Sequence, residues 1–245
     1  MDGVRDADDD APATAERLTA GTAQVRVLRH GREQQPVIVI DNFAADPDAM
    51  VEAAAGLTYQ PIGPYFPGVR HVTPPAQVAE ARERLIGLIQ EVFEIDDPLN
   101  LIESYYSLVT KPADQLEPLQ RLPHFDGLNR RCIAMVHHLS RVERGATAFF
   151  RHRSTGFEIM NRERLPAYNQ AVNREIMRQG MPPARYLNGD TPIYERIGRY
   201  AARYNRLLIY RGDTLHGAEA PDDLPLTDDP RTGRFSVNSF IWLEG

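Results

Sequence analysis

The chain has 245 residues, of which 42% are hydrophobic and 25% charged, and its formal net charge is −6. This is ordinary globular composition, and the acidic balance excludes a generic nucleic-acid binder, which shows a basic stripe. The single cysteine, Cys132, excludes an intrachain disulfide and a thiolate zinc cluster. No apolar run reaches the roughly 18–20 residues of a membrane span. Residues 1–22 are acidic, aperiodic and lack a secretory apolar region, so we expect a disordered leader on a cytoplasmic protein.

The first elements expected are two short strands, in the β-branched runs AQVRVLRHG and PVIVIDNF. A helix follows at DPDAMVEAAAG, with Asp46 as its cap, Pro47 in its first turn and Gly56 just past its end. A loop rich in Pro, Gly and Tyr, TYQPIGPYFPGVRHVTPP, comes next, and a loop of that length suggests a role in covering a substrate. A second helix is predicted over Pro75–Phe93, because its apolar residues form one stripe.

The rest of the chain is mainly β. Five short runs rich in Val, Ile, Tyr, Phe or Thr are separated by breaking residues: IESYYSLVT, RCIAMVHHL, ATAFFRH, NRLLIYRG and GRFSVNSFIWL. One helix, around Pro166–Gln179, interrupts them. Helices first and strands later predict an α+β fold, in a single domain over 23–245. We expect a helical buttress over about 23–100 and a β core over about 101–245.

Three polar side chains form a candidate metal site. LPHFDG contains His124 and Asp126, and residues two apart in an extended segment project to the same side. On its own a His-x-Asp match is weak, and a surface turn explains it equally well. YRGDTLHGAE adds His216, which is 216 − 124 = 92 residues further on. Two imidazoles and one carboxylate form the facial triad that holds Fe(II) and leaves coordination positions open.

The segment RTGRFSVNSFIWL adds an anion-binding pattern. Strand alternation places Arg234 and Ser236 on one face, together with Asn238. A buried arginine is costly unless it meets an anion, and Arg-x-Ser suits a carboxylate. Arg231 competes with Arg234 for this role, but it lies in a turn flanked by Pro and Gly and has no serine partner.

These motifs together resemble a known family. HFD, GDTLHG and an Arg-x-Ser placed 234 − 216 = 18 residues past the second histidine are similar to those of the Fe(II)/2-oxoglutarate-dependent dioxygenases. GDTLHG is most similar to the phytanoyl-CoA dioxygenase type, and RGATAFFRH to the prolyl-hydroxylase type, as in a bacterial branch of the superfamily. The resemblance covers about residues 103–243. It implies a double-stranded β-helix, the jelly-roll, cupin-like barrel, with His124, Asp126 and His216 as iron ligands and Arg234 and Ser236 holding 2-oxoglutarate.

The activity that the resemblance implies is hydroxylation of an unactivated C–H bond of a small molecule, amino acid or peptide. Fe(II) and 2-oxoglutarate are then required, O2 is consumed, and succinate and CO2 are released. Two other interpretations stay open. A zinc-dependent hydrolase would use the same triad, and a cupin-like protein would bind a small ligand or act as a sensor without catalysis.

Further contacts are assigned by position. Tyr105 and Tyr106 alternate, so one ring faces inward, where it either packs in the core or bonds to 2-oxoglutarate; we assign Tyr106 to the co-substrate. A basic patch near a strand end and the Tyr/Pro-rich loop are candidates to contact the substrate. The substrate candidates are Tyr65, Arg70, His138, Arg151 and His152.

Overall fold

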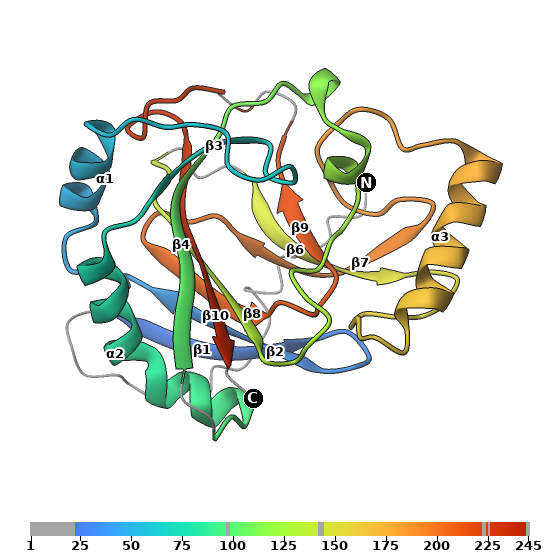
Figure 1. Cartoon of the computed structure of the whole chain (residues 1–245), viewed down its shortest axis with the longest axis horizontal. Coiled ribbons are helices and arrows are strands. Elements are labelled where there is room, and N and C mark those ends of the chain that lie inside the picture. The colour runs from blue at the N-terminus through green and yellow to red at the C-terminus, as the bar shows by residue number, and fades with distance from the viewer. Residues whose placement is uncertain (1–22, 97–98, 142–144, 222–223, 225, 244–245) are drawn as a thin grey trace.

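The computed structural model describes residues 23–96, 99–141, 145–221, 224 and 226–243. The leader expected over 1–22 lies outside these residues. These described residues form three α-helices and ten strands, whose arrangement is shown in Figure 1. The helices are α1 (Pro47–Ala55), α2 (Pro75–Phe93) and α3 (Leu165–Gln179). The strands are β1 (Gln24–His30), β2 (Gln35–Asp41), β3 (Gly68–Val72), β4 (Leu99–Val109), β5 (Cys132–His138), β6 (Ala146–His152), β7 (Tyr194–Ala201), β8 (Arg206–Arg211), β9 (His216–Glu219) and β10 (Arg234–Leu243).

The strands form two antiparallel sheets. The larger has seven strands in the order β1-β2-β8-β5-β10-β4-β3, and the smaller has three in the order β7-β6-β9. From β5 onward the chain passes repeatedly from one sheet to the other, because β5, β8 and β10 belong to the larger sheet and β6, β7 and β9 to the smaller. An apolar cluster joins the two facing surfaces, in which Ala134, Leu208 and Tyr210 pack with Phe149 and Tyr200. The fold is therefore a sandwich built mainly of β-sheet.

The helices lie on the outside of this sandwich. α1 and α2 lie on one side of the molecule and α3 on the opposite side (Figure 1). Asp46 caps α1 by accepting a hydrogen bond from the Ala49 amide at 2.9 Å, as its position before Pro47 predicts. α2 buries Leu85, Ile89 and Phe93, the apolar stripe predicted for it.

The segment before residue 100 is more than a helical buttress. It contains α1 and α2, and it also supplies three strands to the larger sheet. Part of the Tyr/Pro-rich segment is one of these, because Gly68–Val72 pairs with β4 as the edge strand β3. Interpreting the whole segment as a loop was therefore wrong, since Pro and Gly at 61–68 hid a short strand that only pairing with β4 reveals.

Two further strands were not predicted. β7, YERIGRYA, carries three charged side chains and resembles a loop in composition, while β9, HGAE, has only four residues. Both lie beside the apolar strand β6, and their backbone pairing with it fixes their conformation.

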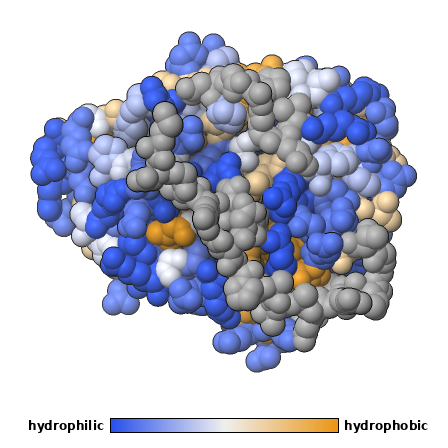
Figure 2. Space-filling model, turned by 180° about the vertical axis from the view of Figure 1, so that it is seen from behind, coloured by the Kyte–Doolittle hydropathy of each residue, from blue (hydrophilic) through white to orange (hydrophobic). Residues whose placement is uncertain are grey.

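The surface agrees with the acidic, polar composition. Figure 2 shows the face opposite to that of Figure 1, where the visible described residues are mainly hydrophilic and the apolar ones form small separate groups. None of the helices in the described part of the chain is long and apolar enough to cross a membrane.

We predict that acid destabilises the fold through the buried histidine His30. Burial lowers the pKa of His30 to about 4, from an ordinary value of 6.5. The unfolded chain therefore takes up this proton first, so the contribution to stability is complete above pH 6.5 and is lost as the pH falls toward 4. The contribution is roughly 3 kcal/mol.

Urea unfolding at several pH values between 4 and 7 measures this dependence. In His30→Phe the slope of unfolding free energy against pH should be shallower across that window. Tyr200→Phe is the matched control, because it removes the hydroxyl 3.2 Å from His30 Nδ1 and keeps the imidazole. Equal slopes in wild type and His30→Phe would contradict the prediction.

Candidate metal centre

Backbone pairing brings the three predicted ligands together. The His124 amide donates to the His216 carbonyl and the His216 amide to the His124 carbonyl, both at 2.8 Å. The Asp126 amide donates to the Gly212 carbonyl at 2.7 Å. The LPHFDG segment thus runs antiparallel to the start of β9, so two residues that are 92 positions apart in sequence lie side by side.

Gly212 gives Asp126 the room to approach. A Cβ added at Gly212 would lie 2.7 Å from Cys132 Sγ and 3.2 Å from the Asp126 carboxylate oxygen Oδ2. Any side chain at this position would push the carboxylate or the thiol away. Cys132 itself is fully buried, and burial raises the pKa of its thiol far above the ordinary value, as expected of an inert core cysteine.

The ligand atoms converge. One atom from each of His124, Asp126 and His216 lies within 4.8 Å of the other two. His124 Nε2 is 3.8 Å from Asp126 Oδ1, and His216 Nε2 is 3.5 Å from Asp126 Oδ2. Asp126 Oδ2 is buried and has no hydrogen-bond partner in the described chain. An uncompensated carboxylate oxygen between two imidazole nitrogens is the donor set that a divalent cation satisfies.

The tautomer of His216 is fixed by its neighbour. Its Nδ1 lies 2.8 Å from the Thr214 carbonyl, which can only accept, so Nδ1 carries the proton. The lone pair of the neutral ring is then on Nε2, the nitrogen that faces Asp126. This second contact orients the ring in the way that metal-binding histidines require.

Burial sets the protonation of the site. It lowers the pKa of His216 to about 4 and raises the pKa of Asp126 to about 6. Burial and the neighbouring His216 also lower the pKa of His124, whose side chain stays 53% exposed at the mouth of the site. At neutral pH the site therefore offers two neutral imidazoles and one carboxylate, so the short His–Asp distances are not ion pairs.

An unpaired arginine faces the same space as the triad. In β10 the side chains of Arg234, Ser236 and Asn238 alternate with the buried Phe235 and Val237, as predicted. The Nε of Arg234 is buried without a hydrogen-bond partner in the described chain. Ser236 Oγ donates to Asn238 Oδ1 at 2.7 Å.

The competing arginine is engaged elsewhere. Arg231 is exposed and donates to both carboxylate oxygens of Glu52, with its Nη2 2.7 Å from Oε2. Of the two arginines, only Arg234 is both inward-facing and without a partner among the described residues.

Assigning Tyr106 to the co-substrate was wrong. Tyr106 pairs with Val237, on the face of the sheet turned away from the triad, and packs against Phe235. Its hydroxyl donates to Gln77 of α2. Tyr105 is the inward-facing ring, because it pairs with Asn238. The alternation was predicted correctly, but the face that each tyrosine takes depends on where α2 packs.

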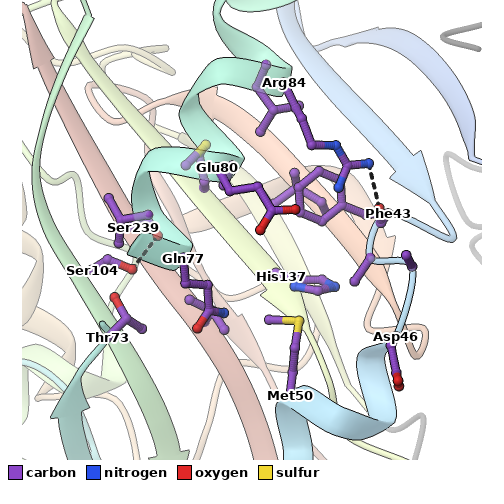
Figure 3. Close-up of a pocket in the computed structure, with 18 residues that line it drawn as sticks. Phe43, Asp46, Met50, Thr73, Gln77, Glu80, Arg84, Ser104, His137 and Ser239 are labelled. Atoms are coloured by element: carbon purple, nitrogen blue, oxygen red, sulfur yellow. Dashed lines mark hydrogen bonds between the residues drawn. The ribbon is translucent and has the colours of Figure 1, made fainter. Parts of the chain in front are cut away.

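That outer face carries a cavity of about 250 Å³ between α1, α2 and the larger sheet (Figure 3). Its lining includes Gln77, His137 and the hydrogen-bonded pair Ser104–Ser239. Val237 and Ser239 of β10 thus face this cavity while Ser236 and Asn238 face the triad side. The cavity is therefore separated from the metal centre by the sheet itself.

Two of the five predicted substrate contacts are neutralised inside the fold. Arg151 is buried and donates to Glu158 at 2.7 Å and to Glu195 at 2.8 Å. His152 is fully buried, 2.8 Å from Glu175 of α3. Assigning Arg151 and His152 to the substrate was wrong, because Glu158, seven residues after Arg151, and the more distant Glu195 and Glu175 already bind these two side chains.

The other three predicted contacts differ in position. Tyr65 is 68% exposed, so it does not contribute to an enclosed site. His138 pairs with Ser236 and therefore shares the face of Arg234; its Nε2 is buried without a partner among the described residues. Arg70 lies on β3, and its charge acts on both Asp126 and His124. His138 and Arg70 therefore lie on the side of the candidate metal centre.

Two residues near the candidate centre, Tyr210 and Phe149, were not predicted from the sequence. The Tyr210 ring lies 4.8 Å from that of His216 and 5.0 Å from that of Phe149, so these two aromatic rings form the apolar floor beside His216. Alternation in NRLLIYRG could have placed Tyr210 inward. Its proximity to His216 follows only from the stacking of the two sheets.

A family model covers nearly the whole chain. Residues 21–241 match the model described as "Family of unknown function (DUF6445)". The chain belongs to the DUF6445 family. No curated protein matches it.

Several solved structures are remotely similar to this DUF6445 member. HygX from Streptomyces hygroscopicus with nickel and 2-oxoglutarate bound is 15% identical, with a TM-score of 0.49 and 87% of each chain covered. A Pseudomonas putida prolyl-4-hydroxylase is 11% identical, with a TM-score of 0.46 and coverage of 87% of this chain and 95% of that one. EctD from S. alaskensis with bound Fe is 14% identical, with a TM-score of 0.46 and coverage of 95% and 88%. Similarity this remote does not define the chemistry of this chain, which depends on its own side chains.

We predict that His216→Ala and Asp126→Asn each weaken Ni(II) binding, measured by calorimetry, by about 100-fold or more. The reason is that each removes one of three ligands, and partners of ligands alone typically contribute 10–100-fold. His71→Ala is the control, because His71 lies outside the triad and its Nδ1 is 2.8 Å from the Thr58 carbonyl. Unchanged affinity in both ligand variants would show that the triad does not hold the ion.

A second prediction separates structural from functional arginines. Arg151→Met should lower the free energy of unfolding by about 3–5 kcal/mol, because it leaves the buried Glu158 carboxylate without its arginine. Arg153→Met should change it by less than about 1 kcal/mol, because the Arg153–Asp190 pair is exposed. Urea denaturation measures both, and Ni(II) affinity should stay at the wild-type value in each. Loss of Ni(II) binding in folded Arg151→Met would contradict the purely structural role.

Proposed function

We propose that this DUF6445 member is an Fe(II)- and 2-oxoglutarate-dependent oxygenase that hydroxylates an unactivated C–H bond of a small molecule, amino acid or peptide. The observation that carries the proposal is the pairing of a convergent His124–Asp126–His216 set with the inward, unpaired Arg234. A metal site alone does not require a buried cation on a strand of the other sheet. A co-substrate that binds the metal at one end and carries a carboxylate at the other explains both.

The topology supports the same proposal. From β5 to β10 the chain contributes strands to both of the facing antiparallel sheets. The 124–126 segment pairs with β9 and so extends the smaller sheet. We infer from this that residues 101–245 form a double-stranded β-helix, the jelly-roll arrangement. His124, Asp126 and His216, where the 124–126 segment pairs with β9, would then lie at one open end of the barrel. A co-substrate can enter there.

The residues of the candidate site would have separate roles in binding the metal and the co-substrate. His124, Asp126 and His216 would hold Fe(II), which when bound supplies the redox chemistry that couples 2-oxoglutarate decarboxylation to substrate oxidation. Arg234 would bind the distal carboxylate of 2-oxoglutarate, and Ser236 would donate a hydrogen bond to the same group in place of its bond to Asn238. His138 is held neutral, because burial and the charge of Arg234 keep its pKa well below the ordinary value. It would therefore contribute a hydrogen bond to this subsite without adding charge.

Tyr210 and Phe149 exclude water beside His216, since both rings are buried and apolar contacts surround them. The exposed side of His124 leaves the entrance open to solvent. A small-molecule or peptide substrate would therefore approach from the His124 side. We also retain the expectations that the protein acts in the cytoplasm and does not bind nucleic acid.

The test is anaerobic addition of Fe(II) and 2-oxoglutarate, followed by visible spectroscopy for the charge-transfer band of the chelate. On admission of O2, succinate should form. Arg234→Gln should weaken 2-oxoglutarate binding about 10- to 150-fold, because charged hydrogen bonds contribute about 1.5–3 kcal/mol. Arg231→Gln is the matched control and should bind like wild type, since its partner is Glu52.

Absence of both the band and succinate would contradict the proposal. Tight Zn(II) binding with hydrolysis of an ester or amide panel would instead favour the zinc hydrolase. Ligand binding without turnover would favour a cupin-like binding or sensor protein.

A further inference from the structure

A second inward arginine, Arg70, lies across the sheet from the co-substrate arginine. The register pairs Arg70 with Ser107, Ser107 with Ser236, and Ser236 with His138. Residues directly opposite each other in antiparallel strands project to the same side. Arg70 therefore lies in a row that crosses four strands on the triad side, with Arg234 two positions from Ser236 on the same face.

Aromatic rings hold the Arg70 guanidinium in place. Its central carbon is 4.1 Å from the centre of the Phe66 ring and 5.2 Å from that of Tyr105. Stacking of this kind fixes the plane of a guanidinium and leaves its edge free for hydrogen bonds. The Tyr/Pro-rich segment supplies both Phe66 and Arg70, so its aromatic residues serve to orient this cation.

Arg70 has no internal counter-ion. Its Nε is buried, and the guanidinium makes no hydrogen bond or ion pair with any described residue. The nearby acids are committed elsewhere. Glu103 accepts a hydrogen bond from the Tyr105 hydroxyl at 3.3 Å. Asp126 faces the two triad histidines, so a bound metal would use its charge.

Other buried arginines of the described chain have hydrogen-bond partners. Arg211 donates to the backbone carbonyls of Arg130 and Phe93. Arg151 is paired with Glu158 and Glu195, and Arg206, which is fully buried, donates to both oxygens of Asp41. A buried or half-buried arginine without a hydrogen-bond partner is therefore an exception among the described residues, and desolvating a cation costs free energy unless an anion compensates it. Arg70 and Arg234 are two such exceptions, and they face one space.

We propose that Arg70 binds a carboxylate of the prime substrate, which is therefore an anionic molecule. The assignment rests on the proposed function, because Arg234 takes the distal carboxylate of 2-oxoglutarate and leaves Arg70 for a second anion. A singly charged carboxylate suits this position better than a phosphate dianion, because it matches the single positive charge of Arg70. The planar fork also matches a planar carboxylate.

The experiment titrates benzoate into the protein loaded with Ni(II) and saturating 2-oxoglutarate, by calorimetry. Trp242 gives a second readout, because it is the only tryptophan and its ring would touch a Cβ added at Gly127, next to Asp126. Benzamide serves as the uncharged probe of equal shape, and phenyl phosphate as the doubly charged one. Benzoate should bind at least about tenfold more tightly than either.

Arg70→Gln should lose at least about tenfold in benzoate affinity, while its 2-oxoglutarate affinity stays at the wild-type value. Arg70→Lys should retain part of the benzoate affinity, because it keeps the charge and loses the fork. Arg231→Gln is the control and should bind both ligands normally. Circular dichroism confirms that each variant is folded.

Three results would overturn the proposal. If benzoate binds no more tightly than benzamide, the protein has no site that is selective for the carboxylate charge. Unchanged benzoate affinity in Arg70→Gln would show that benzoate binds at a site other than Arg70. Weaker 2-oxoglutarate binding in Arg70→Gln than in Arg234→Gln would make Arg70 the co-substrate arginine. If wild type binds no 2-oxoglutarate, the proposed function fails; the benzoate titration with Ni(II) alone then still decides whether Arg70 binds anions.

Discussion

The candidate centre depends on one short piece of backbone pairing. Two reciprocal 2.8 Å hydrogen bonds between His124 and His216 join a segment that has no strand of its own to the four-residue strand β9. Without that pairing, Asp126 would not reach Gly212, and the three ligand atoms would not share one space. The pairing in turn requires that β9 be held by β6, which packs through Phe149 against the larger sheet. The convergence of His124, Asp126 and His216 thus depends on the packing of the two sheets and not on a local loop.

Strand β10 divides the molecule into two environments. Its even-numbered residues from Arg234 to Asn238 face the triad side, and its odd-numbered residues pack beneath α1 and α2 or line the cavity there. Because side chains alternate along a strand, β10 has one face with polar side chains and an unpaired arginine, and an opposite face that is mainly apolar. This explains why Tyr105 and Tyr106, adjacent in sequence, belong to different surroundings. It also keeps the cavity behind the sheet out of contact with the metal centre.

The buried arginines also differ in whether they have partners within the fold. The buried Arg151 and Arg206 meet carboxylates, and the buried Arg211 donates to backbone carbonyls. Arg70 and Arg234 have no such partner among the described residues, and one oxygen of Asp126 has none either. Burying such groups uncompensated costs several kcal/mol in total. The candidate site therefore differs from the rest of the fold in having buried polar atoms without partners among the described residues.

The sequence alone determined much of this protein, because strand alternation and helix periodicity are local. It predicted α2 and the strands β4, β5, β6, β8 and β10, and it selected His124, Asp126, His216 and Arg234 from their residue types and spacing. Only the tertiary structure decided which faces meet. It showed that Arg151 binds Glu195 and His152 binds Glu175, which are 44 and 23 residues away, and that Tyr106 turns toward α2. It also showed that a segment rich in Pro and Gly supplies an edge strand carrying Arg70. Each of these outcomes depends on a partner far away in the chain, and pairing over such distances leaves no local pattern in the sequence.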